Sequence, residues 1–427
     1  MPKVINTVED FKNLVSEIES QKGYRRPLGF GICSVDYGQL NKNKVLQATY
    51  PVANWNENFG SAAIFISALQ ENDIEVDFTQ DEAIFDISYK FMENCLNKFA
   101  PYIQEAYGNS HKNVQVLKHL FDGFLIEDEP ENELIIIPTN EYDVVEPFKI
   151  CFIFDDAPLK SVEATYLKLY ALSTAKAELR SLNLNGAFAT LPNVAWSNGE
   201  PIELDWLREN EIKLKLIGKY PKIDFVDKFP RYLQHIIPAD NTRILDDAKV
   251  RFGAQIAAGT TVMPGASYIN FNSGTTGPVM VEGRISSSAI VGTGSDIGGG
   301  ASILGVLSGT DGNPITIGKN TLLGANSTCG IPIGDACIID GGLAILAGTK
   351  LSIEQDELDK IIEANPGFTA EKATKYENEQ IPSLPSYLFK AKDLAGLNGL
   401  HFRHNSVNGR VEVHRSVREV KLNADLH

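Results

Sequence analysis

Cysteine and histidine are scarce in this chain, and the cysteines follow no metal-binding or disulfide spacing. The 427 residues include five cysteines and seven histidines. The cysteines are odd in number, scattered, and never separated by two residues, which disfavours a zinc site or a disulfide framework. We therefore expect five buried thiols, at Cys33, Cys95, Cys151, Cys329 and Cys337.

Positive charge is also scarce, and no long apolar run occurs. Lysine and arginine number 39 against 55 aspartate and glutamate residues, which gives a net charge of -16. Binding to nucleic-acid phosphates depends on clustered Lys and Arg, so the composition argues against a DNA or RNA partner, although a few focused basic residues could still hold a small anion. The opening MPKVINTVEDFKNL has no signal-peptide pattern, and no apolar stretch reaches the roughly 18 residues that cross a membrane. We expect a cytoplasmic protein with no membrane partner.

An apolar residue recurs at every sixth position from residue 244 to residue 351, with Gly, Ala, Ser and Thr between. This period is typical of a left-handed parallel β-helix, in which each short strand turns one side chain inward and successive turns stack. At about 18 residues per three-sided turn, the span holds roughly five turns. The positions are Ile244, Val250, Ile256, Val262, Val279, Ile285, Val291, Ile297, Ile303, Ile317, Leu323, Ile333, Ile339, Ile345 and Leu351.

The six-residue period has two wide interruptions, between Val262 and Val279 and between Ile303 and Ile317. Both are rich in residues that form turns, so we expect loops that leave the coil at these places. Loops of this kind tend to gather on the binding face of a solenoid.

The chain before the coil is expected to be mixed α/β. Residues 1–155 form an N-terminal region with helical spacing over 81–106, and residues 156–243 form a second α/β region that leads to the coil. A helix is expected over 156–176, where Pro158 stands near the start of an apolar periodic segment.

The chain after the coil is expected to cap it. Residues 352–381 are charged and have helical character, and the Asn408-Gly409 pair predicts a hairpin near the end. The predicted fold class is therefore an N-terminal α/β region, a left-handed parallel β-helix of hexapeptide repeats over 244–351, and a small C-terminal cap of helix and strands over 352–427.

The coil contains no histidine between His235 and His401, and its only glutamate between residues 244 and 353 is Glu282. The missing histidines argue against a three-histidine zinc site and against a coil histidine as general base. Glu282 is followed by a glycine, beside which a ligand can approach the backbone, and by Arg284, which could hold an anionic group. Glu282 is therefore the candidate general base or nucleophile. The alternative is a surface salt bridge at a turn.

Several sequence blocks stand out, in order along the chain: NGAFATLPNVAWSNGEP, GTTVMPGASYINFNSGT, MVEGRIS, VGTGSDIGGGASILGVLSG, IGKNTLLGANS, LAGTK and FRHNSV. Together they resemble the tetrahydrodipicolinate N-succinyltransferases of the lysine and diaminopimelate pathway. The resemblance is to their longer subgroup, known from actinobacteria and some other bacteria, and it runs from about Ser161 to the C-terminus.

This resemblance implies a homotrimer with an active site between the coils of adjacent subunits. The implied reaction moves succinyl from succinyl-CoA to the amino group of tetrahydrodipicolinate, and Glu282 falls at the position of the family's catalytic carboxylate. The family binds its acyl-CoA at positions that correspond here to Arg284, Gly299, Ser302, Ala325, Asp340, Gly341, Gly348, Lys390, Arg403, His404, Asn405 and Ser406. The glycine triplet at 298–300 suits this role, because its amides are open to a pantetheine arm or a developing oxyanion.

The resemblance implies no cofactor beyond succinyl-CoA as co-substrate, and it leaves a metal open. Some relatives hold a magnesium ion with acidic residues near the trimer axis. The opening of this coil instead offers Ala248, Lys249, Gly265 and Ala266, so the sequence does not decide whether magnesium binds.

Two other functions remain open at this point. An enzyme of the same fold could use acetyl-CoA on the same acceptor, since a basic residue for the succinyl carboxylate cannot be identified from position alone. A β-helix without catalysis could serve as an assembly scaffold, in which case Glu282 would be interchangeable with other polar residues.

Overall fold

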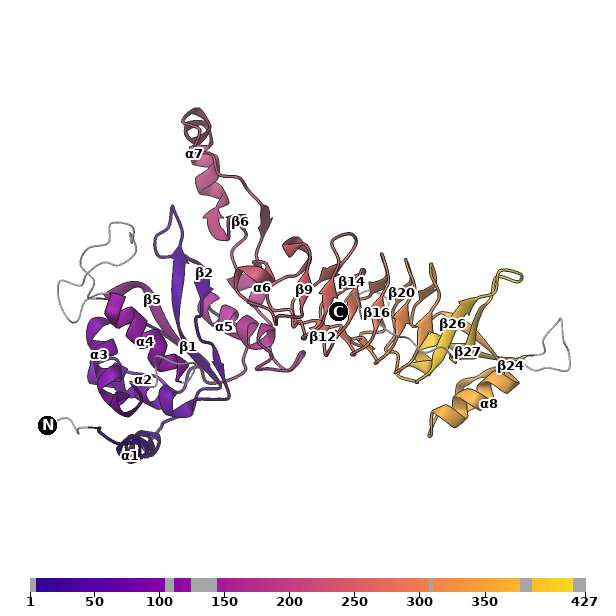
Figure 1. Ribbon diagram of the computed structural model, residues 1–427, viewed down its shortest axis with the longest axis horizontal. Coiled ribbons are helices and arrows are strands. Elements are labelled where there is room, and N and C mark those ends of the chain that lie inside the picture. Colours follow the sequence, from indigo (N-terminus) through magenta and orange to yellow (C-terminus); the bar gives the residue numbers. More distant parts are fainter. Residues whose placement is uncertain (1–4, 104–110, 124–143, 307–309, 377–385, 418–427) are drawn as a thin grey trace. The chain divides into compact units, whose positions relative to one another are not determined.

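The computed structural model describes residues 5–103, 111–123, 144–306, 310–376 and 386–417 (Figure 1). The chain divides into two compact units. The N-terminal unit comprises residues 1–171 and 181–230, and the coil unit comprises residues 172–180 and 231–427.

The N-terminal unit is built on an antiparallel sheet in the order β2-β1-β5-β4, with β3 paired to β1. A smaller antiparallel sheet has the order β7-β6-β8. The strands are β1 (Gly29–Tyr37), β2 (Val45–Thr49), β3 (Asn54–Trp55), β4 (Glu82–Ser88), β5 (Val144–Ile153), β6 (Val194–Ser197), β7 (Glu200–Glu203) and β8 (Phe225–Asp227). The helices up to residue 216 are α1 (Val8–Glu19), α2 (Phe59–Glu71), α3 (Tyr89–Lys98), α4 (Lys112–Gly123), α5 (Val162–Ser173), α6 (Ala187–Thr190) and α7 (Leu204–Leu216).

Aromatic rings fill the core of the N-terminal unit. Phe30 of β1 and Phe152 of β5 face Phe65 of α2 and Phe91 of α3, and all four are at most 1% exposed. Neighbouring ring centroids in this cluster are about 6 Å apart, from 6.0 Å for Phe30 and Phe65 to 6.4 Å for Phe30 and Phe152. Helix α2 is buried along Ala62–Leu69 because nearly every residue there is apolar or small. The core therefore joins sheet and helices through side chains far apart in the sequence.

The predicted helix over 81–106 is wrong in its first part. Residues 82–88 form strand β4, which pairs along β5 from Glu82 opposite Ile153. Helix α3 begins only after Ser88, whose hydroxyl accepts a hydrogen bond from the Phe91 amide at 3.1 Å and so caps the helix. The helix expected over 156–176 is confirmed only as α5, because residues 156–161 and 174–176 are not helical.

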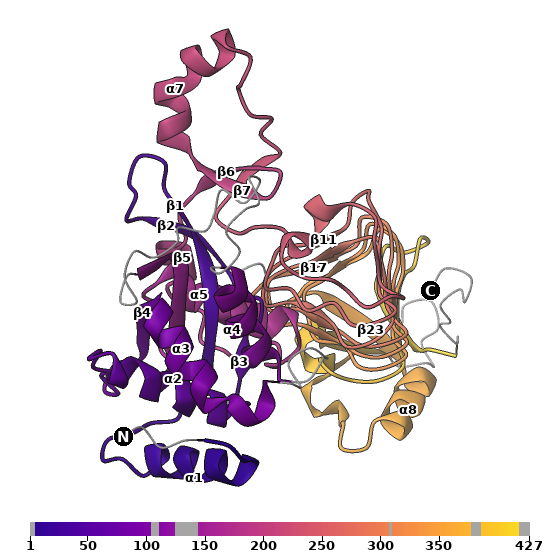
Figure 2. The same cartoon turned by 60° about the vertical axis from the view of Figure 1, so that its left-hand side comes forward.

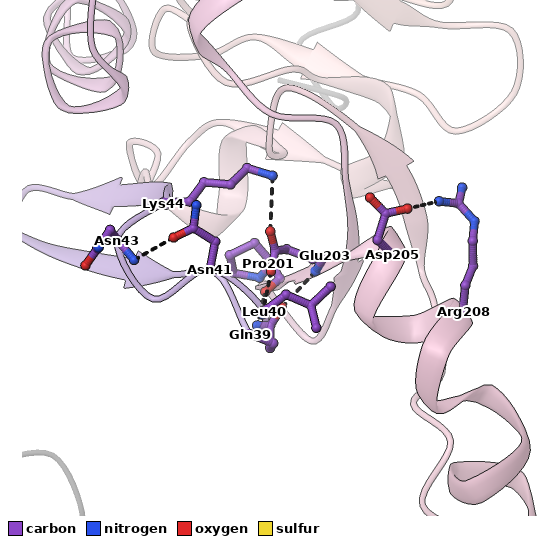
Figure 3. Close-up of polar contacts among 9 residues, drawn as sticks. All are labelled: Gln39, Leu40, Asn41, Asn43, Lys44, Pro201, Glu203, Asp205 and Arg208. Carbon is purple, nitrogen blue, oxygen red and sulfur yellow. Dashed lines mark hydrogen bonds and ion pairs between the residues drawn. The ribbon is translucent and has the colours of Figure 1, made fainter.

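A polar contact joins the two sheets of the N-terminal unit (Figure 3). Glu203, at the end of β7, accepts a hydrogen bond from the Leu40 amide at 2.8 Å and pairs with Lys44 Nζ at 3.1 Å. Gln39 returns two bonds to β7, to the Pro201 carbonyl at 3.2 Å and from the Glu203 amide at 2.8 Å. The turn between β1 and β2 is thereby fixed to the smaller sheet.

The coil unit winds through three parallel sheets, and Figure 2 shows its successive turns one behind another. The first sheet contains β9 (Arg243–Ile244), β10 (Thr261–Val262), β13 (Met280–Val281), β16 (Asp296–Ile297), β19 (Leu322–Leu323) and β21 (Ile338–Ile339). The second contains β11 (Tyr268–Ile269), β14 (Arg284–Ile285), β17 (Ser302–Ile303), β20 (Thr328–Cys329) and β22 (Ala344–Ile345). The third contains β12 (Gly274–Thr275), β15 (Ile290–Val291) and β18 (Thr316–Ile317).

The second residue of most of these strands points into the coil. Ile285, Ile303, Ile317 and Ile339 are 0% exposed, as the six-residue period predicts. Parallel pairing places like residues over one another, for example Val281 over Ile297. Stacked aliphatic side chains thus form a continuous core.

The first expected loop is wrong, because residues 263–278 contain strands β11 and β12 and complete a turn of the coil. The inward residue of β12 is Thr275, whose hydroxyl bonds the Ala257 amide at 3.0 Å and the Thr260 hydroxyl at 2.8 Å. A polar inward residue hides the period from a search for apolar positions. The second expected loop is confirmed in its described residues, because no strand lies in the described part of 304–315.

The C-terminal cap continues the first sheet. Its elements are β23 (Lys350–Glu354), α8 (Gln355–Ala364), β24 (Thr374–Tyr376), β25 (Ser386–Lys390), β26 (Leu400–His404) and β27 (Val411–Arg415). Strand β26 pairs in parallel with β21 of the coil and turns back into β27, which confirms the predicted hairpin. The helix expected over 352–381 is confirmed only as α8, since β24 follows it and residues 377–385 lie outside the described part of the chain.

All five cysteines are buried free thiols, as expected. Within the described residues, no helix combines the length and hydropathy needed to span a membrane.

Candidate active site

Glu282 heads a line of residues at one corner of the coil, where the first sheet turns into the second. The line contains the residue that follows each of β13, β16, β19 and β21, and it ends at Arg403 within β26, which lies level with the residue after β21. Each backbone amide donates to the carbonyl just before the next member, at 2.8 Å for the first three and 3.0 Å for the fourth. We name this line the corner column, and its members are Glu282, Gly298, Gly324, Asp340 and Arg403.

The corner column sets a length for any ligand that follows it. Neighbouring strands in a sheet lie about 4.8 Å apart, so the four steps from Glu282 to Arg403 span roughly 19 Å. The two inner glycines are required by the close stacking of the turns. A Cβ on Gly298 would lie 2.7 Å from the Leu323 carbonyl oxygen, and one on Gly324 would lie 2.5 Å from the Gly341 amide nitrogen.

The carboxylate of Glu282 is half-buried beside the glycine triplet. A Cβ on Gly299 would lie 3.6 Å from Glu282 Oε2, so the missing side chain leaves the carboxylate open on that side. Among the residues that the structure describes, no group donates a hydrogen bond to this carboxylate. It is therefore held by its backbone alone and remains available to a substrate.

The glycine triplet offers one free amide. The amides of Gly298 and Gly300 donate to the Leu323 and Glu282 carbonyls, at 2.8 Å and 3.3 Å. The Gly299 amide has no acceptor within the described parts of the chain. It is thus the one donor of the triplet that could meet a ligand oxygen next to Glu282.

Arg284 and Ser302 lie on the second sheet, next to Glu282. They are register partners on β14 and β17, and Arg284 Nε donates to Ser302 Oγ at 3.3 Å. Arg284 Nη2 also donates to the Gly300 carbonyl at 3.3 Å. Both bonds are long and the side chain is exposed, so the guanidinium can turn toward an anionic ligand without losing a strong contact.

The far end of the corner column carries an acidic and two basic groups. Asp340 Oδ1 lies 2.7 Å from His401 Nε2, and Asp340 Oδ2 lies 3.8 Å from Arg403 Nε. His401 was not among the residues expected at the site, because only the pairing of β26 with β21 brings it onto the coil. The alternation around Phe402, which is buried, was the available signal that His401 and Arg403 face outward.

The remaining expected binding residues fall into two groups. Ala325 and Gly341 are exposed neighbours on adjacent turns, since a Cβ on Gly341 would lie 3.2 Å from the Ala325 carbonyl oxygen. Gly348 is exposed on the last turn, with open space where a side chain would be. The others lie in the cap: Lys390 at the end of β25, and His404, Asn405 and Ser406 at the hairpin.

Asn405 shapes the hairpin turn. Its amide group donates to Glu412 Oε1 at 2.7 Å, and its Oδ1 accepts from the Val407 amide at 3.0 Å.

Taken together, these contacts bring Glu282, Arg284, Gly299 and Ser302 close to one another. Asp340 and Arg403 lie further along the same edge of the coil.

The described residues hold no cluster of three or more His, Cys, Asp or Glu side chains placed for a metal ion. Ala248, Lys249, Gly265 and Ala266 offer no carboxylate oxygen. The nearby Asp246 side chain accepts the Ala248 amide at 3.0 Å and is used as a cap. The chain's own residues at this position thus do not fit a magnesium site.

The coil defines the class of protein. Residues 314–347 match the sequence profile of the hexapeptide repeat of succinyl-transferases. Residues 9–189 and 191–231 match the N-terminal and middle domains of tetrahydrodipicolinate N-succinyltransferase. The match to the N-terminal domain covers the region for which the sequence blocks gave no counterpart.

Relatives align over the whole chain. A 2,3,4,5-tetrahydropyridine-2,6-dicarboxylate N-succinyltransferase of Sulfurimonas denitrificans is 65% identical, with 100% of both chains covered. The enzyme of that name from Campylobacter jejuni is 51% identical, covering 99% of this chain and 100% of its own. A crystal structure from Campylobacter jejuni, described as a 2,3,4,5-tetrahydropyridine-2-carboxylate N-succinyltransferase, superimposes with a TM-score of 0.85 at 50% identity and covers 98% of this chain and 100% of its own. The chain belongs to the tetrahydrodipicolinate N-succinyltransferase family.

Proposed function

We propose that this protein transfers the succinyl group of succinyl-CoA to the amino group of tetrahydrodipicolinate in its ring-opened form. The product is N-succinyl-2-amino-6-oxopimelate, on the route to diaminopimelate and lysine. In this reaction the amine nitrogen bonds to the thioester carbonyl carbon, the C–S bond breaks, CoA leaves as the thiol, and the amine loses one proton. The observation that carries the proposal is the unpartnered carboxylate of Glu282 beside the free Gly299 amide.

Two roles of Glu282 are consistent with its position. As a general base, it takes the proton from the amine while the C–N bond forms. As a nucleophile, it attacks the thioester carbonyl, expels the CoA thiolate and forms an anhydride that the amine then opens. Either role needs an open carboxylate next to the acyl carbon. In both, the Gly299 amide can donate a hydrogen bond to the oxyanion that forms on the carbonyl oxygen.

The corner column supports a path for the donor. From sulfur to the first phosphorus, the pantetheine arm has the reach of about four extended peptide residues, or roughly 14 Å. A thioester beside Glu282 therefore places the phosphates near Arg403, within the roughly 19 Å of the column. The residues that we propose to bind succinyl-CoA are Arg284, Gly299, Ser302, Ala325, Asp340, Gly341, Gly348, Lys390, Arg403, His404, Asn405 and Ser406.

We propose that the protein is a homotrimer in which the coil of a neighbouring subunit supplies the second wall of the site. We also propose that the coil is left-handed. Ala325, Gly341 and Gly348 are exposed, so one chain offers the donor a single wall. Ile212 and Leu216 of α7 are 77% and 81% exposed, and apolar side chains displayed in this way are typical of surfaces that another subunit covers. Closed cyclic symmetry would cover such surfaces without leaving a free end.

The chain is acidic overall, so local basic groups hold the anionic donor. The cytoplasm remains the expected location.

The two alternatives, an acetyl-CoA-dependent reaction and a non-catalytic scaffold, predict a different donor or no acyl transfer at all. The scaffold in particular requires no open carboxylate at Glu282.

A thiol-release assay tests the proposal. We expect rapid release of CoA from succinyl-CoA only when tetrahydrodipicolinate is present, and slow release from acetyl-CoA. Acceptor-dependent turnover of acetyl-CoA with succinyl-CoA inert would replace the proposed donor. No acceptor-dependent release from either thioester would favour the scaffold.

A further inference from the structure

The corner that carries Glu282 is shorter than the corners of the neighbouring turns. Only three residues separate the inward Val281 from the inward Ile285, whereas six separate their counterparts Val262 and Ile269 on the preceding turn. The inward residues of the two turns stack in register, so the additional residues of the longer corner lie outside the line of the coil. Glu282 is therefore set back beside a corner that projects. We name the projecting corner, residues 263–268, the lower corner.

The lower corner presents two free backbone amides. Its ends are fixed, because the Ser267 hydroxyl donates to the Met263 carbonyl and the Tyr268 amide donates to the Gly283 carbonyl at 3.1 Å. Gly265 and Ala266, between these ends, are exposed, and their amides have no acceptor within the described ranges of the chain. These two N–H groups are thus available to an anionic group that lies next to Glu282.

A cationic side chain lies one turn before the lower corner. The bridge between Val250 and Ile269 places Lys249 level with Tyr268, and Lys249 faces outward because Val250 points into the coil. The Lys249 Nζ lies 3.6 Å from Asp246 Oδ2, a long contact between partly exposed groups, which leaves the ammonium able to bind a second anion. The positions that offer no carboxylate to a magnesium ion therefore offer an ammonium and two amides to an anion.

The donor path determines on which side the acceptor lies. A pantetheine arm that follows the corner column from Glu282 toward Arg403 leaves the opposite side, over the lower corner, to the acceptor. The ring-opened acceptor extends from its amine nitrogen to its distal carboxylate over the length of about two peptide residues, or roughly 7 Å. One turn of the coil is about 5 Å and two turns are about 10 Å. With the amine at Glu282, the distal carboxylate falls between the lower corner and Lys249.

We propose that Lys249 and the amides of Gly265 and Ala266 bind the distal carboxylate of the acceptor, and that Lys249 is a specificity-determining residue for a dicarboxylate. The inference rests on the proposed function for the identity of the acceptor. Lys249 is two turns from Glu282, so it acts on the affinity for the acceptor and leaves the chemical step unchanged.

The kinetic test compares Lys249→Gln with Arg243→Gln, a control that removes an exposed positive charge from β9 on the same turn. We expect Lys249→Gln to raise the KM for tetrahydrodipicolinate about tenfold or more, because it removes a charge-assisted hydrogen bond. The KM for succinyl-CoA and kcat should stay unchanged, and Lys249→Arg should restore most of the affinity. An unchanged KM for the acceptor, or an equal rise in Arg243→Gln, would overturn the inference.

Two acyclic amines test the distal carboxylate itself. 2-Aminopimelate carries both carboxylates, and 2-aminoheptanoate has the same carbon chain without the distal one. The wild type should prefer 2-aminopimelate by about tenfold or more in kcat/KM, and Lys249→Gln should lose this preference. A preference of the same size in the variant would contradict the assigned contact.

A binding measurement separates this inference from the proposed reaction. 2-Aminopimelate, titrated calorimetrically into the full chain, should bind the wild type and Arg243→Gln equally and Lys249→Gln about tenfold or more weakly. If the chain transferred no succinyl group but bound the dicarboxylate in this pattern, the proposed function would fail and the site would stand. Equal binding to all three proteins, or no binding to the wild type, would remove the site.

Discussion

In the N-terminal unit, aromatic rings from strands and helices meet in one cluster, whereas in the coil single aliphatic side chains stack turn upon turn. Phe30 and Phe152, which lie 122 positions apart in the sequence, meet in one cluster with Phe65, while Val281 and Ile297 belong to adjacent turns. A core built from distant residues fixes a unique arrangement of elements. A core built from neighbouring turns leaves the coil's corners free to carry other residues, and Glu282 lies at such a corner.

The largest expected effect is on catalytic activity, and it would show that acyl transfer depends on Glu282 at the corner of the coil. We expect Glu282→Gln to lower kcat about 10²- to 10⁴-fold, since the amide can neither take a proton nor attack an acyl carbon. Steady-state kinetics measure the loss, and gel filtration checks that assembly is unchanged. Asp335→Asn is the control, because Asp335 Oδ1 accepts the Lys319 amide at 2.7 Å and asparagine keeps that acceptor. Full activity of Glu282→Gln would contradict the assignment.

The next effect contrasts the two cores. Phe65→Ala should lower the free energy of unfolding by about 3 to 5 kcal/mol, because a large cavity opens in a cluster that several elements share. Ile317→Val removes one methylene from a fully buried position of the coil and should cost about 0.5 to 1.5 kcal/mol. Denaturant unfolding of both variants measures the difference. Equal losses in the free energy of unfolding would mean that the aromatic cluster and the stacked core of the coil do not differ in this way.

Arg180 offers a smaller effect within the coil unit. Its Nε donates to the Ser288 carbonyl at 2.6 Å and its Nη1 to Thr316 Oγ1 at 2.9 Å, so it ties together adjacent turns of the third sheet. We expect Arg180→Met to lower the free energy of unfolding by about 1.5 to 3 kcal/mol.

Arg208→Met is the control for Arg180, because Arg208 is exposed and pairs only locally with Asp205 on α7. Its effect should stay within about 0.5 kcal/mol. If thermal or denaturant unfolding gave similar values for both variants, the turns would not depend on Arg180.

The smallest effect depends on pH and belongs to the N-terminal unit. Burial acts to raise the pKa of Glu203, but hydrogen bonds from the Leu40 amide and from Lys44 outweigh it, so the pKa is lowered. A carboxyl whose pKa is lower in the folded state stabilises that state above its unfolded pKa, about 4.3, and loses this contribution as the pH falls through the folded value. Glu203→Gln should therefore cost about 1 kcal/mol at pH 7, with the difference from wild type vanishing in acid.

Unfolding curves at pH 7 and pH 3 check the Glu203 prediction. Glu209→Gln on the exposed part of α7 serves as the matched substitution and should show no pH-dependent difference. A destabilisation by Glu203→Gln that stayed constant down to pH 3 would mean that the ionised carboxylate is not what fixes the β1–β2 turn.

The coil could be predicted from the sequence because its core is periodic. Ile285, Ile303 and Ile317 all lie inward as expected. The period failed at residues 263–278, where the spacing lengthens from Val262 to Ile269 and the next inward residue is the hydrogen-bonded Thr275. A search for apolar residues cannot find a threonine that satisfies its hydroxyl inside the coil.

The N-terminal unit was less predictable because its order depends on distant pairing. Ile84 and Ile87 fit a helical spacing, but the ladder with β5 holds them in strand β4. The same dependence on distant pairing explains which residues of the site could be predicted. Glu282 and Arg284 were selected from local sequence, whereas His401 reaches Asp340 only through the pairing of β26 with β21.

The most direct test of the account is a crystal structure of the Glu282→Gln variant with succinyl-CoA bound. We predict the thioester carbonyl carbon within about 3.5 Å of the side chain at position 282, the distance of a reactive approach, and the pantetheine arm along Gly298, Gly324 and Asp340 toward Arg403. A donor bound with its thioester remote from position 282, or lying on another edge of the coil, would contradict it.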